Sequence, residues 1–219
     1  MMRTIEEAAV EAATCARCRL AGGRTQVVYG VGDPNADLMF IGEGPGFHED
    51  KQGEPFVGAA GQLLNHMLGE IGLARQSVRI TNVVLCRPPG NRDPLPEEIE
   101  ACAPWLEEQV RLVDPRVIVT LGNFATRTIL GRTVSIGRVR GERFPMGGRT
   151  VIPTFHPAAI LHGGGERSNA FGQMREDFQL VKRTLDRATA PPPASAPGMI
   201  ARADVVAIPD PQDEQLELF

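Results

Sequence analysis

Short apolar runs alternate with longer amphipathic segments along most of the chain. The runs at residues 37–41, 78–85, 117–121 and 151–155 have the length and continuity of buried strands. Apolar residues recur with helical spacing at residues 5–13, 60–71, 96–113, 123–130 and 170–187. This alternation predicts an α/β fold, in which a mostly parallel four-stranded sheet is covered by helices on both faces.

Two of the predicted helices carry end signals. Pro96 followed by two glutamates is a favourable first turn for the helix at 96–113. Asn123 is expected to cap the start of the helix at 123–130, and Gly131 is expected to end it. These residues set the expected helix bounds more closely than the periodicity alone.

Three of the four predicted strands run directly into unusual polar or Gly/Pro-rich sequence. The segments are residues 42–46 (GEGPG), 86–91 (CRPPGN) and 156–159 (HPAA). The carboxyl ends of parallel strands lie at one edge of a sheet, and ligands bind beyond that edge. The sequence therefore predicts an active site there.

The periodic pattern ends at residue 188, so residues 1–188 are expected to form one domain. Residues 189–214 are rich in proline and alanine, which predicts a disordered linker. The last five residues, 215–219 (QLELF), are apolar again and resemble the short peptide by which bacterial replication and repair proteins dock on the DNA sliding clamp. The residues expected to contact a clamp are Gln215, Leu216, Leu218 and Phe219.

The net charge of −4 does not exclude a nucleic-acid partner. The last 30 residues hold five acidic side chains against Arg202 alone, so the remainder of the chain is neutral overall. A neutral body can still present a basic face to phosphates. No apolar stretch has the length of a membrane span, and the first residues lack a signal-peptide core, so we expect a cytoplasmic protein.

All four cysteines fit one metal site. Cys15 and Cys18 form a C-x2-C pair, and Cys86 and Cys102 follow far along the chain. Disulfides are unusual in the cytoplasm, and four thiolates suit either zinc or a [4Fe–4S] cluster. The wide spacing fits a cluster that clamps the N-terminal segment onto the body of the protein. The alternative is four unrelated thiols.

Five motifs in order, together with the cysteines, resemble the family 4 uracil-DNA glycosylases. The motifs are residues 42–46 (GEGPG), 53–58 (GEPFVG), 81–84 (TNVV), 86–94 (CRPPGNRDP) and 156–158 (HPA). The resemblance covers about residues 10–187. It implies a three-layer α/β/α sandwich, a [4Fe–4S] cluster, and a monomeric, monofunctional glycosylase that excises uracil from single- or double-stranded DNA.

The resemblance implies roles for three residues. Phe56 would stack on a uracil flipped out of the DNA helix. The side-chain amide of Asn82 can pair with O4 and N3–H of uracil together, and cytosine presents the opposite pattern at these positions. His156 would point at uracil O2, where negative charge develops as the glycosidic bond breaks.

Gly44 marks a difference from the family 1 enzymes, which carry a water-activating aspartate at the matching place. Glycine cannot activate water, so Glu49, on the loop that follows, is a hypothetical substitute. Glu43 is expected to shape the site through its backbone and carboxylate. Gly42 and Gly44 are expected to contact the substrate, and Asn91 belongs to the rim of the site or to its own turn.

Further DNA contacts are predicted on both sides of this site. An apolar residue among 158–161 could insert into the duplex where the base has left it, or else serve as ordinary helix packing. Four arginines are candidates for phosphate contacts, namely Arg87, Arg92, Arg138 and Arg140.

Three alternatives remain open at this point. The chain could bind uracil in DNA without turnover. It could trap the abasic sugar covalently through a histidine, although the Lys-Arg-Arg-Ile-His insertion of that branch of the superfamily is absent. It could also be a zinc-containing hydrolase, for which no Gly-x-Ser-x-Gly motif is present.

Overall fold

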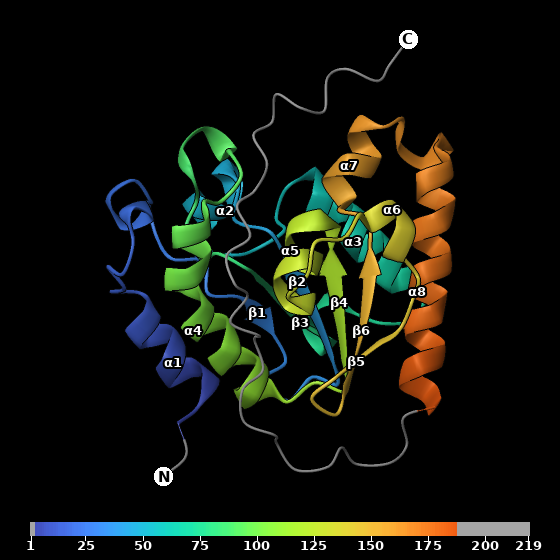
Figure 1. Cartoon of the computed structure of the whole chain (residues 1–219), viewed down its shortest axis with the longest axis horizontal. Helices are drawn as coiled ribbons and strands as arrows, with labels where there is room; N and C mark the ends of the chain where they lie inside the picture. Colours follow the sequence, from blue (N-terminus) through green and yellow to red (C-terminus); the bar gives the residue numbers. More distant parts are fainter. Residues whose placement is uncertain (1–2, 188–219) are drawn as a thin grey trace.

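The computed structural model describes residues 3–187; the predicted linker (189–214) and clamp peptide (215–219) lie outside the described residues. The chain folds around one sheet with the strand order β1-β3-β2-β4-β6-β5 (Figure 1). Strands β3, β2, β4 and β6 are parallel, and β1 and β5 pair antiparallel at the two edges. Their bounds are β1 Val31–Gly32, β2 Leu38–Gly42, β3 Arg79–Asn82, β4 Val117–Leu121, β5 Phe144–Met146 and β6 Arg149–Thr154.

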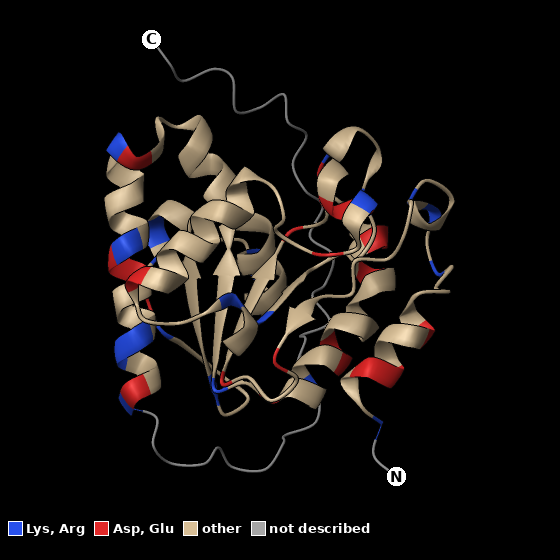
Figure 2. Cartoon of the chain, turned by 180° about the vertical axis from the view of Figure 1, so that it is seen from behind, with Lys and Arg blue, Asp and Glu red and all other residues tan. Residues whose placement is uncertain are grey.

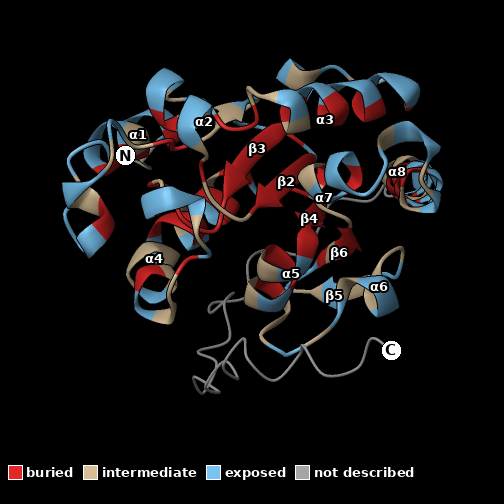
Figure 3. Ribbon diagram, turned by 90° about the horizontal axis from the view of Figure 1, so that it is seen from above, coloured by how far each residue is buried: buried red, intermediate tan, exposed pale blue. Residues whose placement is uncertain are grey.

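Helices cover both faces of the sheet, as Figure 3 shows from above. In β2, Leu38 and Phe40 pack with α3, α7 and α8 on one face, whereas Met39 and Ile41 pack with α4 and α5 on the other. This period-two alternation of buried side chains confirms the predicted three-layer α/β/α sandwich. The helices are α1 Ile5–Ala12, α2 Phe47–Gln52, α3 Ala59–Glu70, α4 Pro96–Val113, α5 Gly122–Leu130, α6 Ile136–Val139, α7 Pro157–His162 and α8 Asn169–Arg187, with 3₁₀ turns at Arg19–Gly22, Arg75–Ser77, Pro89–Asn91 and Gly165–Arg167.

The sheet contains two strands beyond the four expected from the sequence. Strand β1 has two residues and β5 has three, and both are edge strands. Segments this short have no measurable alternation of apolar and polar residues, so the sequence pattern does not reveal them. The same holds for the short helices α2, α6 and α7, which have six, four and six residues.

The predicted cap at Asn123 was wrong. Helix α5 begins one residue earlier, at Gly122, and Leu121 occupies the N-cap position. The Asn123 side chain instead accepts a hydrogen bond from the backbone N–H of Ile136 (2.8 Å), and so ties α5 to the start of α6. Gly131 ends α5 in the left-handed conformation (φ 61°), as expected.

The N-terminal helix α1 is fixed against α4. Its start is capped reciprocally, because Glu7 N–H donates to Thr4 Oγ1 (3.2 Å) and Thr4 N–H donates to the Glu7 carboxylate (2.9 Å). Ile5, Ala8 and Ala12 face a cluster that includes Trp105 of α4. This packing delivers the segment that carries Cys15 and Cys18 to the side of α4.

Asp177 of α8 forms a buried ion pair with Arg140 and a hydrogen bond with Thr154 of β6. Asp177 of α8 is 2% exposed, and its Oδ2 accepts hydrogen bonds from Thr154 Oγ1 (2.7 Å) and Arg140 Nε (3.0 Å). Thr154 is the last residue of β6. The hydrogen bond between Thr154 and Asp177 therefore fixes the end of the strand that leads into His156.

Charged side chains elsewhere are interspersed over the surface. Figure 2 shows acidic and basic residues following one another along α8. Among residues 3–187, no helix combines the length and the apolar composition that a membrane span requires.

We predict that Arg140→Ala lowers the free energy of unfolding by about 3–5 kcal/mol, because it leaves the Asp177 carboxylate buried without its cation. Urea unfolding followed by circular dichroism measures this change.

The matched control is Lys182→Ala, which removes an exposed ion pair with Asp186 on the same helix. It should lower stability by less than about 1 kcal/mol. Equal effects of the two substitutions would contradict the structural role of Asp177.

Candidate active site

The carboxyl ends of three strands bring the predicted site residues together. Gly42 ends β2, Asn82 ends β3, and His156 follows β6. The chain passes from β2 to β3 on one side and then to β4 on the other side of β2, so the site lies where the strand order reverses. Figure 1 shows α2, α3 and α7 near this end of the sheet.

The backbone of Gly42 lies against the side chains of both Asn82 and Phe56. A Cβ atom at Gly42 would lie 2.4 Å from Asn82 Oδ1 and 2.7 Å from Phe56 Cζ. Gly42 and Asn82 are also paired in the register of β2 and β3. Any larger residue at this position would displace both side chains, which explains the glycine.

Phe56 is held in an uncommon backbone conformation. Its φ is 55°, a value that favours glycine, and its side chain is 7% exposed. Gly61, in the first turn of α3, permits this conformation, because a Cβ there would lie 1.7 Å from the Phe56 carbonyl oxygen. The Phe56 and His156 rings are stacked, with centroids 5.6 Å apart and an interplanar angle of 30°.

Asn82 carries a buried acceptor without a partner. Its side chain is 2% exposed, and its Oδ1 has no hydrogen-bond partner among the described residues. The strand beside it is well anchored, since Thr81 Oγ1 donates to the Tyr29 carbonyl (3.0 Å) and accepts from Gln109 Nε2 (3.1 Å). An unpaired acceptor in such a place costs about 1–3 kcal/mol unless a ligand satisfies it.

The hydrogen bonding of His156 defines its tautomer. Its Nδ1 accepts the backbone N–H of Ala158 (3.2 Å) at the start of α7, so the ring proton resides on Nε2. Burial lowers the pKa of His156 to about 4, and the charge of Glu49 opposes this shift only in part. At neutral pH the ring is therefore an uncharged donor through Nε2–H.

The two glutamates of the site have different environments. Glu49 Oε1 accepts the backbone N–H groups of Val57 (3.0 Å) and Gly58 (3.3 Å), which follow Phe56 in the chain. Glu43 follows Gly42 directly, and burial, together with the charge of Asp93, raises its pKa to about 7. Glu49 therefore braces the Phe56 loop, whereas Glu43 can hold or release a proton near neutral pH.

Gly44 and Asn91 differ in how closely they join this group. A Cβ at Gly44 would lie 2.8 Å from Val84 Cγ2, so the segment after β2 passes close to the segment after β3. Asn91 is exposed on the turn Pro89–Asn91, and its Oδ1 accepts from Arg87 Nε (2.6 Å). Its side chain is thus engaged within its own loop.

Two of the four candidate phosphate ligands are occupied by structural ion pairs. Arg92 donates to both carboxylate oxygens of the buried Glu98, and Arg140 pairs with Asp177. Arg87 and Arg138 form no salt bridge within residues 3–187. These two remain the better candidates for contacts with DNA.

The segment at 158–161 forms most of α7 and divides into buried and exposed residues. Ile160 belongs to the core, whereas Leu161 is 39% exposed. Of the two, Leu161 is the residue that could reach a duplex from this helix.

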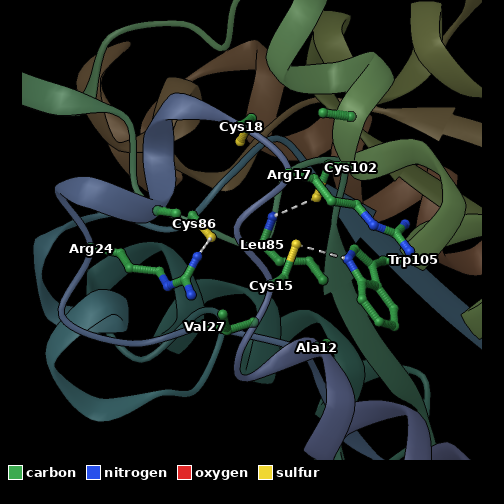
Figure 4. A pocket seen from close by; sticks show the side chains of 12 residues that line it. Ala12, Cys15, Arg17, Cys18, Arg24, Val27, Leu85, Cys86, Cys102 and Trp105 are labelled. Carbon is green, nitrogen blue, oxygen red and sulfur yellow. Dashed lines mark hydrogen bonds between the residues drawn. The ribbon is translucent and has the colours of Figure 1, made fainter.

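The four cysteines line one cavity between the N-terminal segment and α4 (Figure 4). Three N–H groups donate to their sulfur atoms, Trp105 Nε1 to Cys15 (3.2 Å), Leu85 N to Cys102 (3.4 Å) and an Arg24 Nη to Cys86 (3.4 Å). The guanidinium groups of Arg17 and Arg24 also line the cavity. Such donors and cations stabilise thiolates, so the residues fit a negatively charged metal–thiolate group.

The thiols surround this cavity without converging on one point. Within residues 3–187, no three His, Cys, Asp or Glu side chains are placed to hold a single metal ion.

Sequence reasoning missed two positioning residues. Gly61 makes room for the Phe56 carbonyl, and Gly122 (φ 86°) lies against the His156 side chain, where a Cβ would be 3.0 Å from His156 Cβ. Neither glycine belongs to a motif, and only the three-dimensional approach of distant segments identifies them.

Comparison with known proteins gives a consistent result. A family model described as the uracil DNA glycosylase superfamily matches residues 29–179. A type-4 uracil-DNA glycosylase from Sulfurisphaera tokodaii is 44% identical over 190 residues, 83% of this chain and 84% of that relative. The protein of the same name from Thermotoga maritima is 47% identical over 79% of this chain and 90% of its own length. The one from Archaeoglobus fulgidus is 42% identical over 81% of this chain and 89% of its own length.

We predict that the His156 ring stays neutral down to about pH 5 and that Glu43 ionises near pH 7. Because the pKa of folded His156 lies below its ordinary value of 6.5, the unfolded chain takes up that proton first as the pH falls. The contribution of His156 to stability is therefore lost between about pH 6.5 and pH 4. NMR titration of the imidazole nitrogens and of the Glu43 carboxyl carbon measures both values.

The corresponding variants, His156→Gln and Glu43→Gln, identify the signals. A His156 midpoint at or above 6.5 would contradict the buried, neutral ring.

Proposed function

The chain belongs to the uracil-DNA glycosylase superfamily, and on this basis we propose that the site hydrolyses the N-glycosidic bond of uracil in DNA. The products are free uracil and an abasic site, which begins base excision repair. The unpartnered Oδ1 of Asn82 carries the proposal for this particular site, because it is an acceptor held in place for a donor that the protein itself does not supply.

Asn82 would select uracil by its hydrogen-bonding edge. Its Oδ1 accepts N3–H of the base while its Nδ2 donates to O4. Cytosine has an acceptor at N3 and a donor at C4, so both pairs would fail. A buried polar group left unpaired by the wrong base is a strong source of discrimination.

Phe56 would hold the flipped base by stacking. A base inside a duplex cannot be reached, so it is extruded or captured from a single strand. The contact between Gly42 and the Phe56 ring places that ring beside the amide of Asn82. The base is then bound by its face and by its edge at the same time.

His156 would stabilise the leaving group. As the bond to the sugar breaks, negative charge develops on uracil O2, and the Nε2–H group is the free donor of the ring. A preorganised neutral donor serves this purpose, because it lowers the energy of the developing anion without adding a buried charge to the ground state.

Glu49 is the group we propose for activation of water. Gly44 supplies no carboxylate, whereas Glu49 is close enough to His156 for its charge to affect that pKa. One of its oxygens accepts two backbone N–H groups, and within residues 3–187 its Oε2 has no hydrogen bond. That oxygen can orient water toward the cationic sugar. Glu43 would remain a shaping residue whose carboxyl can lose a proton near pH 7.

We propose that Cys15, Cys18, Cys86 and Cys102 bind a [4Fe–4S] cluster. The N–H groups on three of the sulfur atoms and the two arginines support this assignment. A bound cluster would cross-link the N-terminal segment, the segment that carries Cys86, and α4. A structural role accounts for the arrangement.

The remaining parts of the proposal rest on the sequence. We propose a monomer that acts in the cytoplasm on uracil in single- or double-stranded DNA. Residues 215–219, which lie outside the described residues, would tether it to the sliding clamp and raise its local concentration near newly replicated DNA.

We predict that His156→Ala reduces the single-turnover rate of uracil excision by roughly 10²–10³, the usual effect of removing one oxyanion-type donor. Asn82→Ala should reduce uracil excision by about 10-fold or more, because the amide that pairs with the base is lost. A labelled uracil oligonucleotide, treated with protein and then alkali, measures both rates.

The control is His66→Ala, which changes an exposed histidine of α3 and should leave the rate unchanged. Full activity of both site variants would overturn the proposed roles. Glu49→Gln at the wild-type rate would remove Glu49 from the mechanism, and a stable protein–DNA adduct would favour covalent trapping.

We predict further that Cys102→Ala abolishes visible absorbance and lowers iron and sulfide content below about four of each per chain. Its thermal midpoint should fall, because the N-terminal segment loses its attachment to α4. Thr14→Ala, next to Cys15 on the exposed end of that segment, is the control. Zinc instead of iron in the purified protein would contradict the assignment.

A further inference from the structure

Phe47 is an apolar side chain that the proposed chemistry leaves unused. It is 47% exposed, whereas Phe40 and Phe178 of the core are almost fully buried. It begins α2, directly after the glycine-rich segment that follows β2. A single exposed apolar residue is common on a protein surface, so the argument for a ligand depends on the side chains around this ring.

Cationic side chains surround this ring. The Arg87 guanidinium lies over it at 5.1 Å from the centroid, the Lys51 ammonium at 5.8 Å, and the His48 ring meets it edge-on at 5.5 Å. Within residues 3–187, neither Arg87 nor Lys51 forms a salt bridge. We call Phe47, His48, Lys51 and Arg87 the rim patch.

The rim patch is connected to the site through two elements. Helix α2 also carries Glu49, whose carboxylate holds the backbone just after Phe56. Arg87 lies on the segment that follows β3 and Asn82, and its Nε is held by Asn91 Oδ1 (2.6 Å). The patch therefore joins the segments that leave β2 and β3, the two strands that end in Gly42 and Asn82.

An aromatic ring flanked by cations matches the chemistry of single-stranded nucleic acid. Bases stack on aromatic side chains whatever their sequence, and nearby cations contact the phosphates. An acidic protein partner would use the cations but not the exposed aromatic ring. A purely apolar partner would have to bury Arg87 and Lys51 without counter-charges.

We propose that the rim patch binds the DNA strand next to the flipped uracil, with a neighbouring base stacked on Phe47 and phosphates near Lys51 and Arg87. The inference rests on the proposed function and adds a substrate preference to it. A base in a duplex is already stacked on its neighbours, so it gains little from Phe47. The patch therefore favours uracil in single-stranded DNA over uracil in a duplex.

The test compares Phe47→Ala, Phe47→Leu and Phe47→Trp in the full-length, metal-containing protein. Binding is measured by fluorescence anisotropy with a uracil-free single-stranded oligonucleotide and with the matching duplex at one salt concentration. Phe47→Ala and Phe47→Leu should weaken single-strand binding by roughly 5- to 150-fold. Duplex binding should change less than about 2-fold, and Phe47→Trp should retain wild-type affinity, because it keeps an aromatic face.

The matched control is Val10→Ala, which truncates another exposed apolar residue (75% exposed) on α1, remote from the carboxyl ends of the strands. It should change neither affinity. Lys51→Gln should reduce the slope of log affinity against log salt by about 0.7, the value for one phosphate of a single strand.

Three results would overturn the proposal. Phe47→Ala could leave single-strand binding unchanged, or weaken single-strand and duplex binding equally. Phe47→Leu could also bind like wild type, which would show that apolar area rather than stacking matters. Because these measurements use DNA without uracil, they remain valid if excision fails, and the excision assay with Asn82 and His156 variants tests the proposed function separately.

Discussion

Strands β2 and β3 end side by side, and the missing side chain at Gly42 lets Asn82 and Phe56 approach one point from two directions. The remaining features of the site depend on this close approach. Phe56 must adopt a positive φ to reach it, and Gly61 must lack a side chain to allow that conformation. The local strain is balanced by Glu49, which accepts the next two backbone N–H groups.

Burial sets the protonation of two titratable groups of the site, His156 and Glu43. His156 is neutral because it is buried and because its Nδ1 already accepts a backbone N–H. Glu43 retains a proton close to neutral pH because its carboxyl is buried near Asp93. A glycosylase of this kind needs a donor for the leaving base and an anion for the cationic sugar. The proposed mechanism assigns the donor to His156 and the anion to Glu49, so it does not require an aspartate at the position of Gly44.

The sequence predicted the four parallel strands and the long helices, because their apolar patterns extend over whole elements. The strand predicted at 78–85 was too long, since β3 ends at Asn82 and the apolar residues after it are buried without belonging to the sheet. The motifs after the predicted strands also indicated the correct edge of the sheet, where Gly42 and Asn82 end their strands and His156 follows β6. It could not predict β1 or β5, whose two and three residues carry no periodicity. Nor could it assign Asn123, because its partner, the N–H of Ile136, is supplied by tertiary packing that no local signal reveals. The mutual contact of Gly42, Asn82 and Phe56 likewise required the fold.

The positions of the cysteines in the sequence divide the site residues into those between Cys15 and Cys102 and those beyond Cys102. A bridge between Cys15 and Cys102 would close a loop that contains Gly42, Phe56 and Asn82, while His156 lies beyond it. Closing a long loop lowers the conformational entropy of the unfolded chain within the loop. Loss of the bridge would therefore lower the stability of the folded chain as a whole, while the strand that leads into His156 keeps its own attachment to α8 through Thr154 and Asp177. The segments that carry Gly42, Phe56 and Asn82 and the segment that carries His156 are thus held in the fold by different contacts.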